Sequence, residues 1–190
     1  MVRGRRVGPI LVLMMLLMGP ACGAEEQPRL TPTRDVDIHY DVTRPQKPKV
    51  RERVRWLAAE GLERVDASGR STSIFERAAH AVTLLTPATR TFRKLDRAPR
   101  RPLEPEPGAV LARGADAIVA GLQCTDWSWT EDGEKHTVCA TADGVILRLV
   151  VDGQTFIEAR SVKYGPQKAD LFRVPANYTP ALAPEGAGEP

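Results

Sequence analysis

Methionine is missing from almost the whole chain. All four methionines, Met1, Met14, Met15 and Met18, lie in the first 18 residues. A flexible methionine-lined groove of the kind that binds many different partners is therefore excluded. Beyond this N-terminal stretch, the chain also lacks any apolar run long enough to cross a membrane as a helix.

The N-terminal stretch has the three parts of a secretory signal. Arginines precede an apolar run at residues 10–18, and small residues follow it. The run is too short to span a bilayer, so residues 1–24 are predicted to be a signal peptide. The mature protein would then be periplasmic. Lipid attachment to Cys22, which would anchor it in the outer membrane, is the alternative.

Net positive charge is absent from the mature chain. The full sequence has 27 Lys+Arg and 24 Asp+Glu, and the predicted signal holds three arginines and no acidic residue. The remainder is formally neutral. The basic character of the whole chain therefore gives no reason to expect a nucleic-acid partner.

The chain also lacks the motifs of common catalytic and cofactor sites. It has no C-x-x-C pair, nucleophile elbow, phosphate-binding loop or G-x-G-x-x-G element. His39, His80 and His136 lie on different predicted strands and lack metal-ligand spacing. We therefore expect no enzymatic activity, no cofactor and no metal ion.

Two cysteines, Cys124 and Cys139, remain after the signal. In an oxidising compartment such a pair is expected to form a disulfide, and a zinc site with His136 is the weaker alternative because no fourth ligand is evident. A cross-strand disulfide favours directly opposed residues. This constraint predicts a four-residue hairpin loop at residues 130–133, whereas a tight loop at Asp132-Gly133 would place the cysteines diagonally.

Alternating apolar and polar residues predict a mainly β domain with little helix over residues 34–178. In the first half, strands are expected at 34–43, as a pair within 49–65, and near 73–77, 81–85 and 91–95. An amphipathic helix over 54–65 is the alternative to the pair, but Gly61 lies inside it and strands are expected on both sides.

Three segments outside the predicted strands have a different composition. Residues 97–112 are rich in proline and arginine, and are expected to form an exposed connection that ends in a turn of helix near 109–113. Residues 25–33 are predicted to be a flexible lead-in, and residues 179–190 a disordered tail.

Asp-Gly pairs at 132–133, 143–144 and 152–153 predict an antiparallel meander in the second half. Its strands are expected at about 119–130, 134–141, 145–151 and 154–164. Parity across the turns places large apolar side chains from all these strands on one face. This face comprises Trp127, Trp129, His136, Val138, Ala140, Leu147, Leu149, Val151 and Phe156.

The apolar side of the predicted sheet is a candidate binding surface. One sheet cannot bury its own face without a covering layer, and the sequence predicts few helices to provide it. The face is therefore either the core of the domain or an uncovered groove for an apolar ligand. The candidate lining residues are Tyr40, Trp56, Trp127, Trp129, Leu149 and Phe156.

Three segments, Ala120–Trp127, Thr137–Gly144 and Ala169–Tyr178, resemble a bacterial exported family of unknown function that is grouped with the LolA/LolB-like lipoprotein carriers. The resemblance implies a half-open antiparallel β-barrel around an apolar cavity. The function expected from it is non-enzymatic binding of a lipid acyl chain or a lipoprotein. The alternative is an interaction or sensor module that presents a sheet edge or the basic loop 97–101 to another envelope protein.

Overall fold

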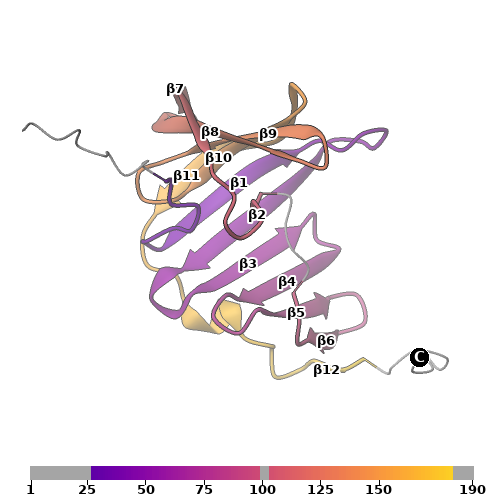
Figure 1. Cartoon of the computed structure of the whole chain (residues 1–190). Helices are drawn as coiled ribbons and strands as arrows, with labels where there is room; N and C mark the ends of the chain where they lie inside the picture. The colour runs from indigo at the N-terminus through magenta and orange to yellow at the C-terminus, as the bar shows by residue number, and fades with distance from the viewer. Residues whose placement is uncertain (1–26, 99–102, 182–190) are drawn as a thin grey trace, which may run out of the picture.

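The structure is a computed structural model that describes residues 27–98 and 103–181 (Figure 1). Its strands form one sheet in the order β12-β6-β5-β4-β3-β2-β1-β11-β10-β9-β8-β7. All neighbouring strands are antiparallel except the short pair β12 and β6. Figure 1 shows β7–β10 curving over β1 and β2, so the predicted mainly β, half-open antiparallel barrel is confirmed.

The strands of the first half are β1 (Val36–Val42), β2 (Val50–Leu57), β3 (Leu62–Ala67), β4 (Ser71–Glu76), β5 (Ala81–Thr86) and β6 (Thr91–Leu95). Those of the second half are β7 (Ala112–Val119), β8 (Leu122–Glu131), β9 (Glu134–Ala140), β10 (Ile146–Val151), β11 (Gln154–Tyr164) and β12 (Thr179–Pro180). Two short 3₁₀ turns, η1 (Ala58–Glu60) and η2 (Ala169–Phe172), complete the described elements. The turn of helix expected near 109–113 is wrong, because β7 begins there.

The predicted disulfide joins Cys124 and Cys139, but the predicted four-residue loop is wrong. Glu131 pairs with Glu134, so β8 and β9 are joined by the two-residue loop Asp132-Gly133, both with positive φ. Cys139 is therefore opposite Asp126, and the disulfide crosses the ladder diagonally with a Cα–Cα distance of 5.4 Å. The twist between paired strands brings one diagonal closer than the other, which makes this pairing possible.

The central Asp-Gly pair does not form a two-residue loop. Ala140 pairs with Ile146, and the ladder then shifts register before Arg148. The shift moves Leu147 away from the face that parity predicts for it, and its side chain packs beside the disulfide instead. Ile146 takes a place among the tryptophans. An unbroken parity count over the meander is therefore wrong at this bulge.

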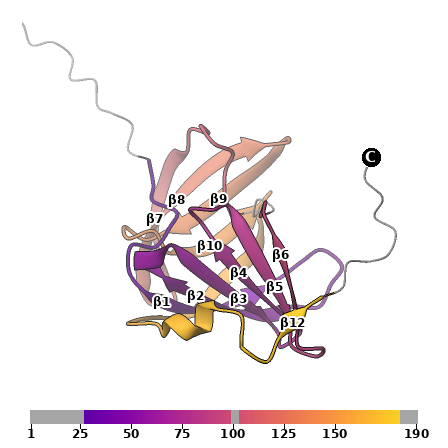
Figure 2. The same ribbon diagram turned by 90° about the horizontal axis from the view of Figure 1, so that it is seen from below.

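The core has three groups of buried side chains. The central cluster, around the disulfide, consists of Val36, Ile38, Tyr40, Val42, Val54, Trp56, Val119, Cys124, Cys139, Val145, Leu147 and Ala159. The tryptophan cluster consists of Leu103, Leu111, Trp127, Trp129, Val138, Ala140, Ile146, Leu149 and Val151. The outer cluster, Leu57, Ile74, Leu85 and Phe172, lies where η2 packs beneath β2–β5 (Figure 2).

Candidate ligand-binding site

The structure divides the six candidate lining residues between two clusters. Tyr40 and Trp56 belong to the central cluster, whereas Trp127, Trp129 and Leu149 belong to the tryptophan cluster with Phe156 at its margin. The hydroxyl of Tyr40 connects the two, because it donates a 2.6 Å hydrogen bond to the carbonyl oxygen of Ile146. All except Phe156 are buried. They do not line one open groove.

The cover over these side chains comes from the chain itself. Residues 103–111, which we call the strap, lead into β7 and pass over β1 and β2 (Figure 1). Leu103 and Leu111 are buried in the tryptophan cluster. The strap therefore departs from the exposed connection expected from its composition at these two leucines, whereas its residues 106–108 and 110 are exposed. The two buried leucines cover the apolar face of the sheet, a role for which the sequence predicts no helix.

The segment before β1 is also docked. Leu30 packs against the tryptophan cluster, and the side chain of Gln27 accepts a 3.2 Å hydrogen bond from the backbone N–H of Leu111. The N–H of Thr33 donates to the carbonyl oxygen of Asp143 at 2.9 Å. These contacts differ from the flexible lead-in predicted for residues 25–33, since they attach it to the strap and to the β9–β10 loop.

A charged group lies on the inner face beneath the strap. Trp56, Glu63 and Phe75 are directly opposed across β2, β3 and β4, so their side chains share this face. The guanidinium of Arg77, just after β4, donates to the carboxylates of both Glu63 and Glu104. It also lies over the ring of Trp56, at 5.1 Å from the centroid. Glu104 belongs to the strap, so this ion pair attaches the strap to the sheet.

Burial shapes the electrostatics of this group. Glu63 is only 1% exposed, and a carboxylate in that position requires a cation beside it. Burial alone would lower the pKa of Arg77, but the carboxylates of Glu63 and Glu104 outweigh it and raise the pKa. Sequence reasoning missed all three residues. The sequence did contain a signal at Glu63. Residues two apart on a strand point to the same face, so Glu63 shares the face of Val65, and a charged residue on that face needs a partner.

Two cavities meet at this charged group. The outer pocket has a volume of about 270 Å³ and is lined by Phe75, Glu76, Arg77, His80, Ala81, Ala98, Glu104, Pro105 and Pro107. The inner cavity has a volume of about 30 Å³ and is lined by Leu30, Pro32, Ile38, Tyr40, Val54, Trp56, Glu63, Arg77, Leu103, Glu104, Gly144 and Ile146. Arg77 and Glu104 line both, so their ion pair separates the outer pocket from two of the predicted aromatic residues.

A larger and more polar hollow of about 600 Å³ lies beside the disulfide. Asp143 on its wall accepts hydrogen bonds from Arg34 and from the hydroxyl of Tyr164, each 3.0 Å long. Burial raises the pKa of Asp143, but hydrogen bonds from Thr141, Arg34 and Tyr164 outweigh it, so the pKa lies below 3.8. These partners satisfy the charge of Asp143 within the protein.

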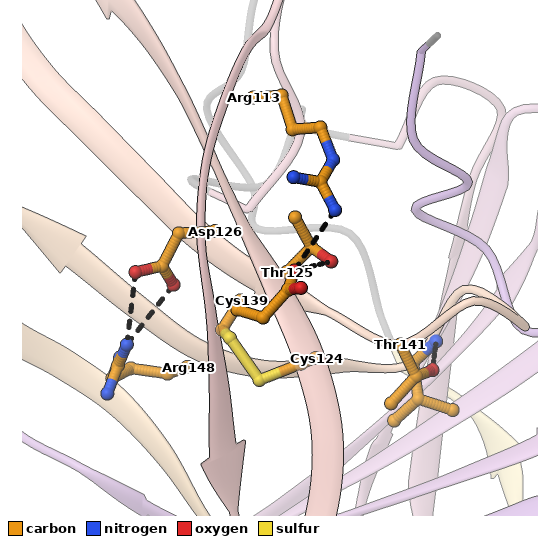
Figure 3. Close-up of a disulfide and its surroundings, with 9 residues drawn as sticks. Arg113, Cys124, Thr125, Asp126, Cys139, Thr141 and Arg148 are labelled. Atoms are coloured by element: carbon orange, nitrogen blue, oxygen red, sulfur yellow. Dashed lines mark hydrogen bonds and ion pairs between the residues drawn. A yellow bond between two sulfur atoms is a disulfide. The ribbon is translucent and has the colours of Figure 1, made fainter.

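Figure 3 shows that the disulfide is flanked by charged side chains. Arg148 donates to Asp126 at 3.1 Å on one side. On the other, Thr125 and Arg113 both donate to Asp116. Each of these arginines has an acid beside it, and the arrangement strengthens the hairpin rather than preparing an anion site.

Neither a metal-ligand group nor a membrane-spanning helix is found among the described residues. Over residues 27–98 and 103–181, no group of three His, Cys, Asp or Glu side chains is placed to hold a metal ion. In the same part of the chain, no helix has the length and apolarity needed to cross a bilayer. The predicted signal and Cys22 lie outside the described residues.

No family model matches the sequence, and no curated protein matches it. Among solved structures, the chain is similar to an uncharacterized conserved protein from Thermus thermophilus, with 14% identity and a TM-score of 0.54 over 77% of this chain and 90% of that one. This similarity concerns the fold. Membership of the exported family suggested by the sequence motifs stays a prediction.

Two further structures are more distant. MucB, in the Pseudomonas aeruginosa MucA/MucB complex, is 12% identical with a TM-score of 0.44, over 75% of this chain and 56% of that chain. PNGF-II is 12% identical with a TM-score of 0.48, over 73% of this chain and 30% of that chain. This chain thus spans little more than half of the MucB chain and under a third of PNGF-II.

Proposed function

We propose that this protein is an exported, non-enzymatic binding module that takes an apolar moiety, such as the acyl chain of a lipid or lipoprotein, on its concave face. The observation that carries the proposal is the pair of cavities that meet at Arg77 and Glu104. The outer pocket has mainly apolar walls and lies at the turn between β4 and β5, and the inner cavity reaches Tyr40 and Trp56. Apolar concavities with a few convergent polar groups are typical ligand sites.

The strap gives this site a cover that can be exchanged. It is held by two buried leucines, by Ala109 packed against the same cluster, by the hydrogen bond between Leu111 and Gln27 and by an ion pair, and residues 103–111 belong to no strand. An acyl chain that replaced Leu103 would bury the same kind of apolar surface. Trp127, Trp129, Leu149 and Phe156 would then become accessible from the inner cavity through the position of Leu103. This role of the aromatic residues is part of the proposal.

Lipid extraction and tryptophan fluorescence test the proposal. Protein purified from a periplasmic extract should contain an acyl-bearing molecule by mass spectrometry, and added laurate should change the emission of the buried tryptophans. Ala81→Phe fills the outer pocket and should weaken binding. Ala112→Phe places the same side chain at an exposed position on β7 and is the matched control. Absence of both bound lipid and a fluorescence response would refute the proposal.

The second candidate function is an interaction module for another envelope protein. The observation that favours it is the edge strand β7, whose Ile118 is 77% exposed. A partner strand could pair with this edge, as in other cases of β-augmentation. Pull-down of envelope proteins by wild type and by Ile118→Lys tests it, with Arg97→Glu as a test of the basic loop. Recovery that is the same for all three proteins would count against both surfaces.

A further inference from the structure

We propose that Arg77 selects a ligand with a single acyl chain that ends in a carboxylate, and that Glu104 of the strap occupies the place of that carboxylate in the structure. The inference rests on the proposed function, since it names the head group of the same apolar ligand. Its basis is the position of one cation at the boundary between a mainly apolar outer pocket and a small inner cavity.

The two carboxylates that bind Arg77 differ in how they are held. Glu63 lies in the middle of the sheet, on β3, and is fully buried. Glu104 lies on the strap, and its side chain is 32% exposed. A movement of the strap would therefore remove Glu104 from Arg77 but leave Glu63 in place. Only the carboxylate of Glu104 is exchangeable.

Exchange requires another anion, because Arg77 would otherwise lose a partner in apolar surroundings. Its guanidinium lies against the rings of Trp56 and Phe75, at 5.1 and 5.7 Å from their centroids. An N–H donor left unsatisfied in such a place costs about 1–3 kcal/mol. A ligand carboxylate restores a charge-assisted hydrogen bond, whereas an ester offers a weaker, neutral acceptor.

One N–H group of Arg77, that of Nε, is also available to a ligand. Its Nη1 and Nη2 groups bind Glu104 and Glu63, whereas its buried Nε has no hydrogen-bond partner within the described part of the chain. Arginine binds carboxylates most strongly through two parallel N–H groups. A ligand free to orient its carboxylate can use Nε as well, which the tethered Glu104 does not.

The cavity volumes fix where the chain lies. The outer pocket extends from Arg77 between Phe75 and the strap prolines Pro105 and Pro107. Its volume of about 270 Å³ is just below the usual range for small-molecule sites, which begins near 300 Å³. One acyl chain fits this space better than the two chains of a phospholipid. The expected ligand class is a fatty acid.

Titration with laurate and methyl laurate tests the head-group preference. Both have the same acyl chain, and binding is measured by tryptophan fluorescence and by calorimetry at pH 7.5. Laurate should bind wild type about tenfold more tightly than the ester, the difference expected between a charge-assisted and a neutral hydrogen bond. Equal affinity for acid and ester would overturn the inference and leave the proposed function standing. Binding of neither would refute the proposed function itself.

Glu104→Gln tests the competition without disturbing the buried pair of Arg77 and Glu63. Since the strap would then lack its charge, laurate affinity should rise by about three- to tenfold. Glu60→Gln, on the exposed turn η1, is the control and should not change it. Arg77→Gln should abolish the preference for acid over ester, provided that circular dichroism shows a folded protein. An unchanged laurate affinity in Glu104→Gln would also overturn the inference.

Discussion

Gly144 and Thr31 are in close backbone contact, although 113 positions separate them in the sequence. A Cβ atom on Gly144 would lie 2.1 Å from the carbonyl oxygen of Thr31, and Gly144 has a φ of +92°. Glycine is therefore required here both by the conformation and by the approach of the second chain segment. The segment before β1 thus packs against the β9–β10 loop.

Replacement of this glycine should release the docked segment. Gly144→Ala is expected to lower the free energy of unfolding by about 3 kcal/mol, because it adds a steric clash to the cost of a left-handed alanine. Gly153→Ala is the matched control: it has a φ of +78° but no atom within 4 Å, so it should cost only about 1 kcal/mol. Urea unfolding gives both values.

Limited proteolysis provides the second measurement for the same pair. Arg29, which is exposed, should be cleaved by trypsin faster in Gly144→Ala than in Gly153→Ala. Equal stability losses and equal cleavage rates in the two variants would show that the docked segment contributes nothing.

Reduction of the disulfide should destabilise the protein without abolishing its sheet. The bridge closes a loop with a sequence separation of 15, for which the chain-entropy model gives about 3 kcal/mol. A reductant should therefore lower the melting temperature clearly. The double variant Cys124→Ala/Cys139→Ala should melt at the lower temperature with or without reductant. A wild-type melting temperature that does not respond to reductant would contradict the prediction.

Much of the fold could be predicted because its signals are local. The alternation in β1 and the Asp-Gly turns at 132–133 and 152–153 specify strands and hairpins within a few residues of themselves. The loop around Gly144 is different, since it also contacts the backbone of Thr31. That contact is remote in sequence. The ladder beside this loop also shifts register between Ile146 and Arg148, and a parity count that assumes an unbroken ladder does not predict such a shift.

β7 and the strap were missed for related reasons. All but two of the side chains of β7 are exposed, and an edge strand of this kind carries no alternating pattern. In the strap, Leu103 and Leu111 stand among prolines with no helical or strand period. Their burial is decided by the shape of the sheet beneath them. The candidate site was therefore predicted as an open aromatic face, whereas its charged centre at Arg77 was not found.

Asp66 should contribute to the resistance of the protein to acid. It accepts hydrogen bonds from Arg55 at 2.7 Å, Arg64 at 2.9 Å and Thr72 at 2.7 Å. Burial raises its pKa, but the bonds from Arg64 and Thr72 and the charge of Arg55 outweigh it, so the pKa lies below 3.8. A lowered pKa in the folded state means that this contribution is present above pH 3.8 and is lost as the pH falls through the folded value.

Asp66→Asn tests this contribution. The variant should lose about 2 kcal/mol at pH 7, because two arginines lose a charged acceptor in a half-buried site. Its unfolding free energy should also fall less steeply than that of wild type below about pH 3.8. Asp132→Asn, in an exposed hairpin turn that suits asparagine, should match wild type. Parallel acid titrations of Asp66→Asn and wild type would contradict the assignment.

The ring of His136 is predicted to contribute to the protein by packing against Trp129 and not by binding a ligand or transferring a proton. Its ring stacks on that of Trp129 with centroids 5.1 Å apart, and its buried Nδ1 has no hydrogen-bond partner among the described residues. His136→Phe keeps the stacked ring and removes the unsatisfied atom, so it should be as stable as wild type or more stable by about 1 kcal/mol. His136→Ala should lose about 2 kcal/mol of stability, because it removes the stacked ring.

His39→Phe, at an exposed position on β1, controls for the exchange of histidine for phenylalanine and should change little. If urea unfolding shows that His136→Phe is clearly less stable than wild type, Nδ1 makes a hydrogen bond in solution and the proposed packing role is wrong.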